Sequence, residues 1–269
     1  MVTGASRGIG KAIALALAAA GYDVAITART VTEGTSDEGL PGSLATTLAE
    51  IEALGSRALA VPMDLLDRDA LVPAVETVLE AFGYLDVLVN NAISVGPGND
   101  QRFLDVDMAD VERRITGNLT AQLVITQRAL KAMVARGGGT VINITTGAGM
   151  TSPVKPIGEG GWALSYAVSK GGLHRAAGVL AIELGSSGIV AYNLQPGFVA
   201  TERATAQPHL SWLSDMGNPP ELIGQVLVWM LAQPPGTIRN GKTIHATDIG
   251  RKLGLLPDDA PAADAALYG

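Results

Sequence analysis

The chain has 269 residues, with 19 lysines and arginines against 26 aspartates and glutamates, a formal net charge of −7. Hydrophobic residues make up 47% of the sequence and charged residues only 17%, which excludes a disordered chain and predicts a sizeable core. The acidic balance argues against a nucleic-acid partner, and the absence of cysteine excludes disulfides, thiolate metal sites and cysteine nucleophiles.

The spacing of apolar residues predicts alternating strands and helices. Ile9, Ile13 and Leu17 recur every fourth residue, which predicts a first helix that ends near Gly21. In chain order, the strands predicted after it are 23–28, 58–63, 85–90, 140–145, 189–194 and 243–246. The other predicted helices are 43–54, 70–82, 107–136, 166–184 and 220–231. This alternation is typical of a doubly wound, Rossmann-type α/β fold with a parallel sheet.

Neither a repeat nor an interior linker interrupts the chain, so we expect one domain over residues 1–269. Residues 30–42, 94–101 and 147–161 are expected to be loops, and residues 261–269 a loose tail. The start of the chain lacks the basic flank and apolar run of a signal peptide. The longest apolar runs fall far short of the roughly 18 residues that a membrane helix needs. We therefore expect a soluble, cytoplasmic protein without membrane association.

Residues 3–10 read Thr-Gly-Ala-Ser-Arg-Gly-Ile-Gly and lie between a short strand and a helix. Glycine allows a tight turn and a close approach of the backbone to a pyrophosphate, which would lie at the positive N-terminus of the helix. An ordinary strand-to-helix turn is the alternative. The position at the first junction between strand and helix favours a phosphate-binding loop.

Four motifs occur in the order found in short-chain dehydrogenases/reductases, and they span nearly the whole chain. They are Thr3-Gly4-x-x-x-Gly8-x-Gly10, Asn90-Asn91-Ala92, Tyr166-x-x-x-Lys170 and Pro196-Gly197. The chain therefore resembles this family, which implies an NAD(P)-dependent oxidoreductase. Residues 29–31, 40–42 and 248–255 are also similar to the dehydrogenase/reductase member 1 branch.

One departure from the family concerns the first strand. The family usually has several apolar residues before the Thr-Gly pair, whereas only Met1 and Val2 precede it here. Because this strand lies between two others, its loss would leave ladder groups unpaired. We expect a shortened first strand, and we favour the hypothesis that the true start lies upstream over that of a weakened protein.

The end of the second strand predicts which dinucleotide is used. The acidic residue that would bind the adenosine ribose is replaced by Ala28, and Arg29 follows it. Arg29 and Arg7 together favour NADP(H) over NAD(H), because arginine binds a phosphate with a planar fork of donors. Solvated surface arginines are the alternative. The resemblance implies these cofactor contacts: Gly4, Ser6, Arg7, Gly8, Ile9, Gly10, Arg29, Asp64, Leu65, Asn90, Ala92, Tyr166, Lys170, Pro196, Gly197, Val199 and Thr201.

Tyr166 and Lys170 are four residues apart, so both project from one face of a helix. A nearby ammonium lowers the pKa of a phenol from about 10, and the phenol can then exchange a proton with a carbonyl oxygen. A chance surface pair is the alternative. The resemblance places Thr146 where the family has a serine that polarises the carbonyl; Ser152 and Ser165 are possible substitutes. It also assigns Asn118 to the asparagine that bends the long helix and holds a water for Lys170.

Residues 202–219, which include Trp212, Leu213 and Met216, are predicted to be a lid over an apolar substrate. His174, His209 and His245 lack a metal-ligand spacing, so no metal is expected. The family usually forms dimers or tetramers through the two long helices, here 107–136 and 166–184.

The sequence thus predicts an NADP(H)-dependent oxidoreductase that interconverts a small-molecule carbonyl and its alcohol. The catalytic residues would be Tyr166, Lys170, Thr146 and Asn118. A second hypothesis is a non-catalytic module that binds a nicotinamide dinucleotide in redox sensing or as a scaffold. Thr146, the long 147–161 loop and the short first strand motivate it.

Overall fold

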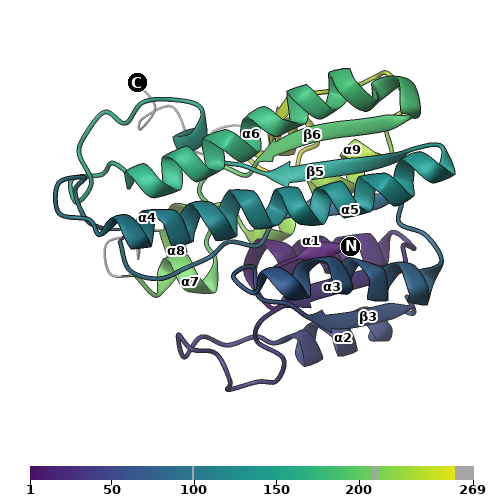
Figure 1. The fold of residues 1–269 in the computed structure, drawn as a ribbon, viewed down its shortest axis with the longest axis horizontal. Helices are drawn as coiled ribbons and strands as arrows, with labels where there is room; N and C mark the ends of the chain where they lie inside the picture. The colour runs from purple at the N-terminus through teal and green to yellow at the C-terminus, as the bar shows by residue number, and fades with distance from the viewer. Residues whose placement is uncertain (99, 208–209, 211–212, 258–269) are drawn as a thin grey trace.

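A parallel seven-stranded sheet forms the centre of the computed structural model, which describes residues 1–98, 100–207, 210 and 213–257 (Figure 1). The strand order is β3-β2-β1-β4-β5-β6-β7. The strands are β1 Val2–Thr3, β2 Val24–Ala28, β3 Ala58–Pro62, β4 Val87–Asn90, β5 Gly139–Ile144, β6 Ile189–Gln195 and β7 Thr243–His245. The order reverses direction between β1 and β4, and such a switch point is where doubly wound folds bind ligands.

Helices cover both faces of the sheet (Figure 1). Those longer than seven residues are α1 Gly8–Ala19, α2 Leu44–Ala53, α3 Arg68–Phe82, α4 Met108–Ile115, α5 Ala121–Arg136, α6 Leu164–Leu184 and α9 Pro220–Leu231. Side chains of α1, α2 and α9 share one core cluster, and those of α3 and α5 share another. Val24 and Ile26 of β2 enter the first cluster and Ala25 the second, as expected for a strand buried on both faces. The predicted α/β fold is confirmed.

Strand β1 has only two residues, yet it pairs with a strand on each side. The Thr3 hydroxyl strengthens this short connection, because it accepts from the backbone N–H groups of Asn91 and Ala92, both at 3.0 Å. The same hydroxyl donates to the Val89 carbonyl at 3.2 Å. A buried side chain thus supplies contacts between β1 and β4 that a longer strand would make through its backbone.

The long helix predicted over 107–136 is interrupted. Helices α4 and α5 are joined by a π-helical turn at Thr116–Thr120 (η1), a wider turn that often marks a functional position. A Cβ at Gly117, within this turn, would lie 2.3 Å from the Ser94 Cβ. Among the described residues after β6, the short α-helices are α7 Glu202–Thr205, α8 Leu213–Met216 and α10 Ala246–Lys252. The sequence analysis did not predict α10 and wrongly extended the last strand to Ala246, where α10 begins.

Some predictions fall on residues that the structure does not describe. Trp212, His209 and the tail at 261–269 lie outside the described residues. In the part of the chain that is described, no helix is long and apolar enough to cross a membrane.

Candidate active site

The loop at residues 4–10 requires glycine for steric reasons. Gly4 has φ +69°, and a Cβ there would lie 2.7 Å from the Ala92 Cα. A Cβ at Gly10 would lie 2.2 Å from the Gly4 carbonyl oxygen. Helix α1 begins at Gly8, and no side chain caps its N-terminus. The first N–H groups of α1 therefore lack a side-chain acceptor, as a phosphate-binding helix requires.

Asn91 fixes this loop to the end of β4. Its Nδ2 donates to the carbonyls of Thr3 at 2.9 Å and Gly4 at 3.1 Å. The sequence analysis selected its neighbours Asn90 and Ala92 and missed Asn91, although it lies in the same motif. The Asn90 amide instead donates to Thr126 Oγ1 and Asn143 Oδ1 in the sheet interior. Its side chain therefore belongs to the core, whereas we expected it on the ribose side.

The segment after β6 lies against the same loop. Gly197 has φ +73°, and its N–H donates to the Gln195 side chain at 2.9 Å. Thr201 lies beside Gly8, since a Cβ at Gly8 would come 3.2 Å from the Thr201 methyl group. The same position lies 3.5 Å from Glu202 Oε2, a buried oxygen without a hydrogen-bond partner among the described residues. A carboxylate of this chain therefore lies beside the N-terminus of α1.

Arg7 and Arg29 both contact the 30–42 loop. Arg7 donates from Nε to the Pro41 carbonyl at 2.7 Å and from a terminal nitrogen to the Gly42 carbonyl at 2.6 Å. The pKa of Arg7 is lowered, mainly because the guanidinium is partly buried. Arg29 lies 3.7 Å from Asp37 and 3.8 Å from Glu38. Both arginines therefore contact other groups of the protein. The acidic residues beside Arg29 lie in a loop that has no periodic sequence pattern, so the sequence did not predict these contacts.

The remaining cofactor candidates lie at the ends of strands or in the first helix. Asp64 follows β3, and its carboxylate accepts the Leu66 N–H at 2.9 Å, while Leu65 is buried. Ser6 is buried, and Ile9 packs against the core cluster that contains α1. The Pro196 carbonyl accepts from Asn218 Nδ2 at 3.4 Å, and Val199 forms an isolated bridge with Asn218.

Tyr166 lies in the first turn of α6, and Lys170 one turn further on. Burial raises the pKa of the Tyr166 phenol, while hydrogen bonding with Thr146 and the positive charge of Arg114 oppose this effect. Lys170 is buried and donates to the Ile144 carbonyl at 2.8 Å, and desolvation lowers its pKa to about 8. The ammonium is thus engaged at the end of β5, and the Arg114 charge opposes the rise in the Tyr166 pKa. That Lys170 lowers the Tyr166 pKa stays a prediction.

A hydroxyl that hydrogen-bonds with Tyr166 comes from Thr146, two residues after the end of β5. Of the two substitutes considered, Ser152 is exposed, whereas Ser165 is buried and its Oγ has no partner in the described part of the chain. Hydrogen bonding with Thr146 thus acts to lower the Tyr166 pKa, and the assignment of Thr146 to the place of the family's serine stays a prediction.

Asn118 lies in η1 and is almost fully buried. Its Oδ1 accepts the Ser94 N–H at 2.7 Å, and its Nδ2 donates to Ser169 Oγ at 3.2 Å. Asn118 therefore connects the loop after β4 to α6 beside Lys170.

Two successive arginines, which the sequence analysis missed, hold the loop after β4. Arg114 is only 3% exposed and donates to the carbonyls of Ser94 at 3.2 Å and Gly96 at 3.1 Å. Arg113 donates to the carbonyls of Val95 and Pro97, both at 3.0 Å. The sequence signal that could have revealed the burial of Arg114 is Val111, an apolar residue three positions earlier. Residues three apart share a helix face, and Val111 is buried. The Arg114 charge is thus buried, and it opposes the rise in the Tyr166 pKa.

The described residues contain no group of three or more side chains suited to a metal ion. His174 Nδ1 lies 3.2 Å from the Thr145 hydroxyl, and burial lowers its pKa. His245 is exposed at the end of β7.

Comparison with known proteins identifies the family. The sequence profile of the short chain dehydrogenase family matches residues 1–210. A 3-oxoacyl-[acyl-carrier-protein] reductase from Synechocystis sp. is 35% identical over 250 residues, which cover 91% of this chain and 93% of the relative. An L-rhamnose 1-dehydrogenase (NAD(P)(+)) from Sphingomonas sp. is 36% identical over 203 residues, 75% of this chain and 72% of the relative.

A solved structure has the same fold. It is the 3-oxoacyl-[acyl-carrier protein] reductase from Brucella melitensis in complex with NAD, with a TM-score of 0.74 and 29% identity. The match covers 91% of this chain and 93% of that chain. The chain belongs to the short-chain dehydrogenase/reductase family and is an NAD(P)-dependent oxidoreductase.

The residues present fit a dinucleotide. The uncapped N-terminus of α1 and the glycines that cannot carry a Cβ suit its pyrophosphate. Glu202 opposes the pyrophosphate at the N-terminus of α1, because its carboxylate lies beside Gly8. Since residues 202–205 form a four-residue helix at partly exposed positions, this side chain can turn away without disturbing the core.

Proposed function

We propose that the chain interconverts a carbonyl and an alcohol with NADP(H), and that Tyr166 is the acid and base. The observation that carries this proposal is the grouping of Thr146, Tyr166 and Lys170 at the end of β5. The strands are parallel, so this group lies at the same edge of the sheet as the 4–10 loop after β1. A dinucleotide bound along this edge would connect the two.

The nicotinamide, when bound, supplies or accepts a hydride at the substrate carbon. In reduction, the Tyr166 hydroxyl donates its proton to the carbonyl oxygen, and in oxidation it removes the proton from the alcohol. The Thr146 hydroxyl donates a hydrogen bond to the same oxygen and orients it. Lys170, whose pKa is about 8, exchanges protons within the site near neutral pH. Asn118 holds the loop after β4 in place beside α6.

We assign the pyrophosphate to the 4–10 loop and a 2′-phosphate to Arg29 and Arg7. Asp64 and Leu65 would contact the adenine, Ala92 and the Asn90 backbone the ribose side, and the 196–201 segment the nicotinamide. The preference for NADP(H) is supported by Arg29 and by Ala28 in place of an acidic residue. The similarity to the dehydrogenase/reductase member 1 branch stays a prediction.

The substrate is a small carbonyl compound or alcohol, and residues 202–219 are its lid. Leu213, which is buried, and Met216, which is half exposed, supply apolar surface there. Since the relatives are named for 3-oxoacyl groups and L-rhamnose, both classes are suitable first substrates.

Assembly as a homodimer or homotetramer is supported by a groove between α5 and α6. Its apolar lining includes Leu123, Leu130, Val134 and Val179, and three of these side chains are about two-fifths exposed or more. A second copy of the chain would cover this surface.

The test is calorimetric titration of the protein with NADPH and NADH, followed by turnover assays on wild type and Tyr166→Phe. We expect tighter binding of NADPH, and in Tyr166→Phe a loss of turnover of at least about 100-fold with binding unchanged. Equal turnover in the variant would reject Tyr166 as the acid and base. Tight binding without turnover of any substrate by the wild type would favour the non-catalytic module.

A further inference from the structure

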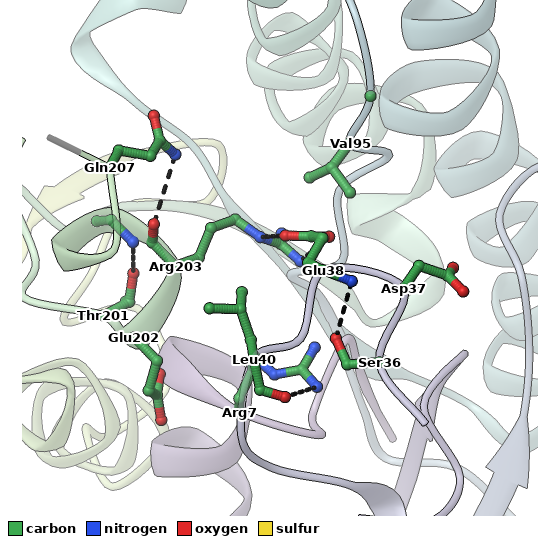
Figure 2. A network of polar contacts seen from close by, with 12 residues as sticks. Arg7, Ser36, Asp37, Glu38, Leu40, Val95, Thr201, Glu202, Arg203 and Gln207 are labelled. Atoms are coloured by element: carbon green, nitrogen blue, oxygen red, sulfur yellow. Dashed lines mark hydrogen bonds and ion pairs between the residues drawn. The ribbon is translucent and has the colours of Figure 1, made fainter. Parts of the chain in front are cut away.

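Three arginines from distant parts of the chain surround one carboxylate. Arg203 of α7 binds Glu38 of the 30–42 loop through two nitrogens, at 2.8 and 3.0 Å (Figure 2). Arg29, at the end of β2, lies 3.8 Å from the same carboxylate. Arg7 of the phosphate loop is close enough that the charges of Arg203 and Glu38 both affect its pKa. Glu38 therefore faces the guanidinium groups of Arg203 and Arg29 directly, and its charge also acts on Arg7.

The neighbouring residue adds a second negative charge. Asp37 lies 3.7 Å from Arg29, and its side chain is 82% exposed. A bidentate contact with Arg is the same geometry in which guanidinium groups bind phosphate. A phosphate monoester carries about −1.5 to −2 charges at pH 7, close to the combined charge of Asp37 and Glu38.

The arrangement has a consequence for the dinucleotide. Arg29 and Arg7 are the residues that we assign to the 2′-phosphate, and Glu38 already occupies the space between Arg29 and Arg203. We propose that Glu38 determines the cofactor preference: its carboxylate must leave the arginines before a 2′-phosphate binds them, and a dinucleotide without this phosphate leaves it in place. Arg203 then becomes a third phosphate ligand. This inference rests on the proposed function.

The experiment compares Glu38→Gln with Asp37→Asn as the matched control. Calorimetry would measure the dissociation constants of NADPH and NADH, and of adenosine 2′,5′-bisphosphate against adenosine 5′-phosphate as probes of the phosphate alone. We expect Glu38→Gln to tighten NADPH and the bisphosphate by about three- to tenfold, with NADH and the monophosphate within twofold of wild type. Asp37→Asn should have a smaller effect, because Asp37 is more exposed.

A second variant tests the role of Arg203. Arg203→Gln in the Glu38→Gln background should reverse the gain for NADPH and leave NADH unchanged. Weaker NADH binding with unchanged NADPH in Glu38→Gln would overturn the inference, because Glu38 would then bind ribose hydroxyls. Unchanged affinities for all four probes, in a wild type that binds NADPH, would also overturn it. Failure of wild type and variants to bind any dinucleotide would instead contradict the proposed function.

Discussion

Two buried threonines on neighbouring strands provide a stringent test of the contacts that hold the site. Thr3 and Thr27 are paired in register and are both fully buried. The Thr3 hydroxyl makes three hydrogen bonds, to groups of Val89, Asn91 and Ala92. The Thr27 hydroxyl is buried without a partner among the described residues. The substitution Thr→Val preserves the shape of each side chain and removes only the hydroxyl.

The two substitutions should change the free energy of unfolding differently: Thr3→Val should lower it, whereas Thr27→Val should leave it unchanged or raise it slightly. Thr3→Val leaves two partly buried N–H groups without this acceptor. A fully buried group without a partner costs about 1–3 kcal/mol, and because these two are only partly buried, we expect a loss of about 2–4 kcal/mol in the free energy of unfolding. Thr27→Val removes a hydroxyl whose burial without a partner is itself unfavourable, so we expect between no change and a gain of about 1 kcal/mol.

Equilibrium unfolding in urea measures both changes, and an unchanged slope shows that the unfolded state is comparable. Thr3→Ser, which keeps the hydroxyl, should recover most of the loss. Nucleotide affinity should fall in Thr3→Val, because Thr3 and Asn91 together position the backbone at Gly4. Equal effects of the two valine variants on stability would refute the reasoning.

Three further changes test other parts of the site. Between pH 8 and 10.5, Lys170 is deprotonated in the folded chain, where its pKa is about 8, but protonated in the unfolded chain, where its pKa is 10.5. The stability of the wild type should therefore rise with pH over this range, and Lys170→Met should flatten that rise. Parallel dependences of stability on pH for the two proteins, measured by unfolding in urea, would contradict this. Arg114→Met should shift the pH profile of turnover upward, because the charge that lowers the Tyr166 pKa is lost. Arg113→Met removes contacts with the same loop and with Asp110 but no charge named as acting on Tyr166, so it should leave the profile in place. Gly10→Ala should cost about 1–3 kcal/mol and abolish nucleotide binding, whereas Gly21→Ala, with φ +86° and open space, should leave binding intact.

Local patterns in the sequence predict much of this fold. Short apolar runs predict the six described strands after the first helix to within a few residues, and the glycines at 4, 8 and 10 predict the first turn. The three glycines act through contacts within the loop or with neighbouring strand ends, which is why they form a recognisable motif.

Other features depend on contacts between distant segments. Glu38 and Arg203 are 165 residues apart, and both lie in segments without periodicity. Arginine is usually exposed on a helix, so the residue type gives no reason to expect Arg114 to be buried. It is buried because α4 packs against the loop after β4. The spacing of four residues from Tyr166 pointed to Lys170, whereas no motif pointed to Arg114.

The π-helical turn at Thr116–Thr120 places a limit on changes in chain length. Each residue added to or removed from a helix rotates what precedes it by about 100°. A deletion in this turn would swing α4 around its axis relative to α5 and carry Arg113 and Arg114 away from the carbonyls that they hold. Insertions and deletions should therefore be rare between α4 and α5 and accumulate instead in exposed loops that make none of the contacts of the site.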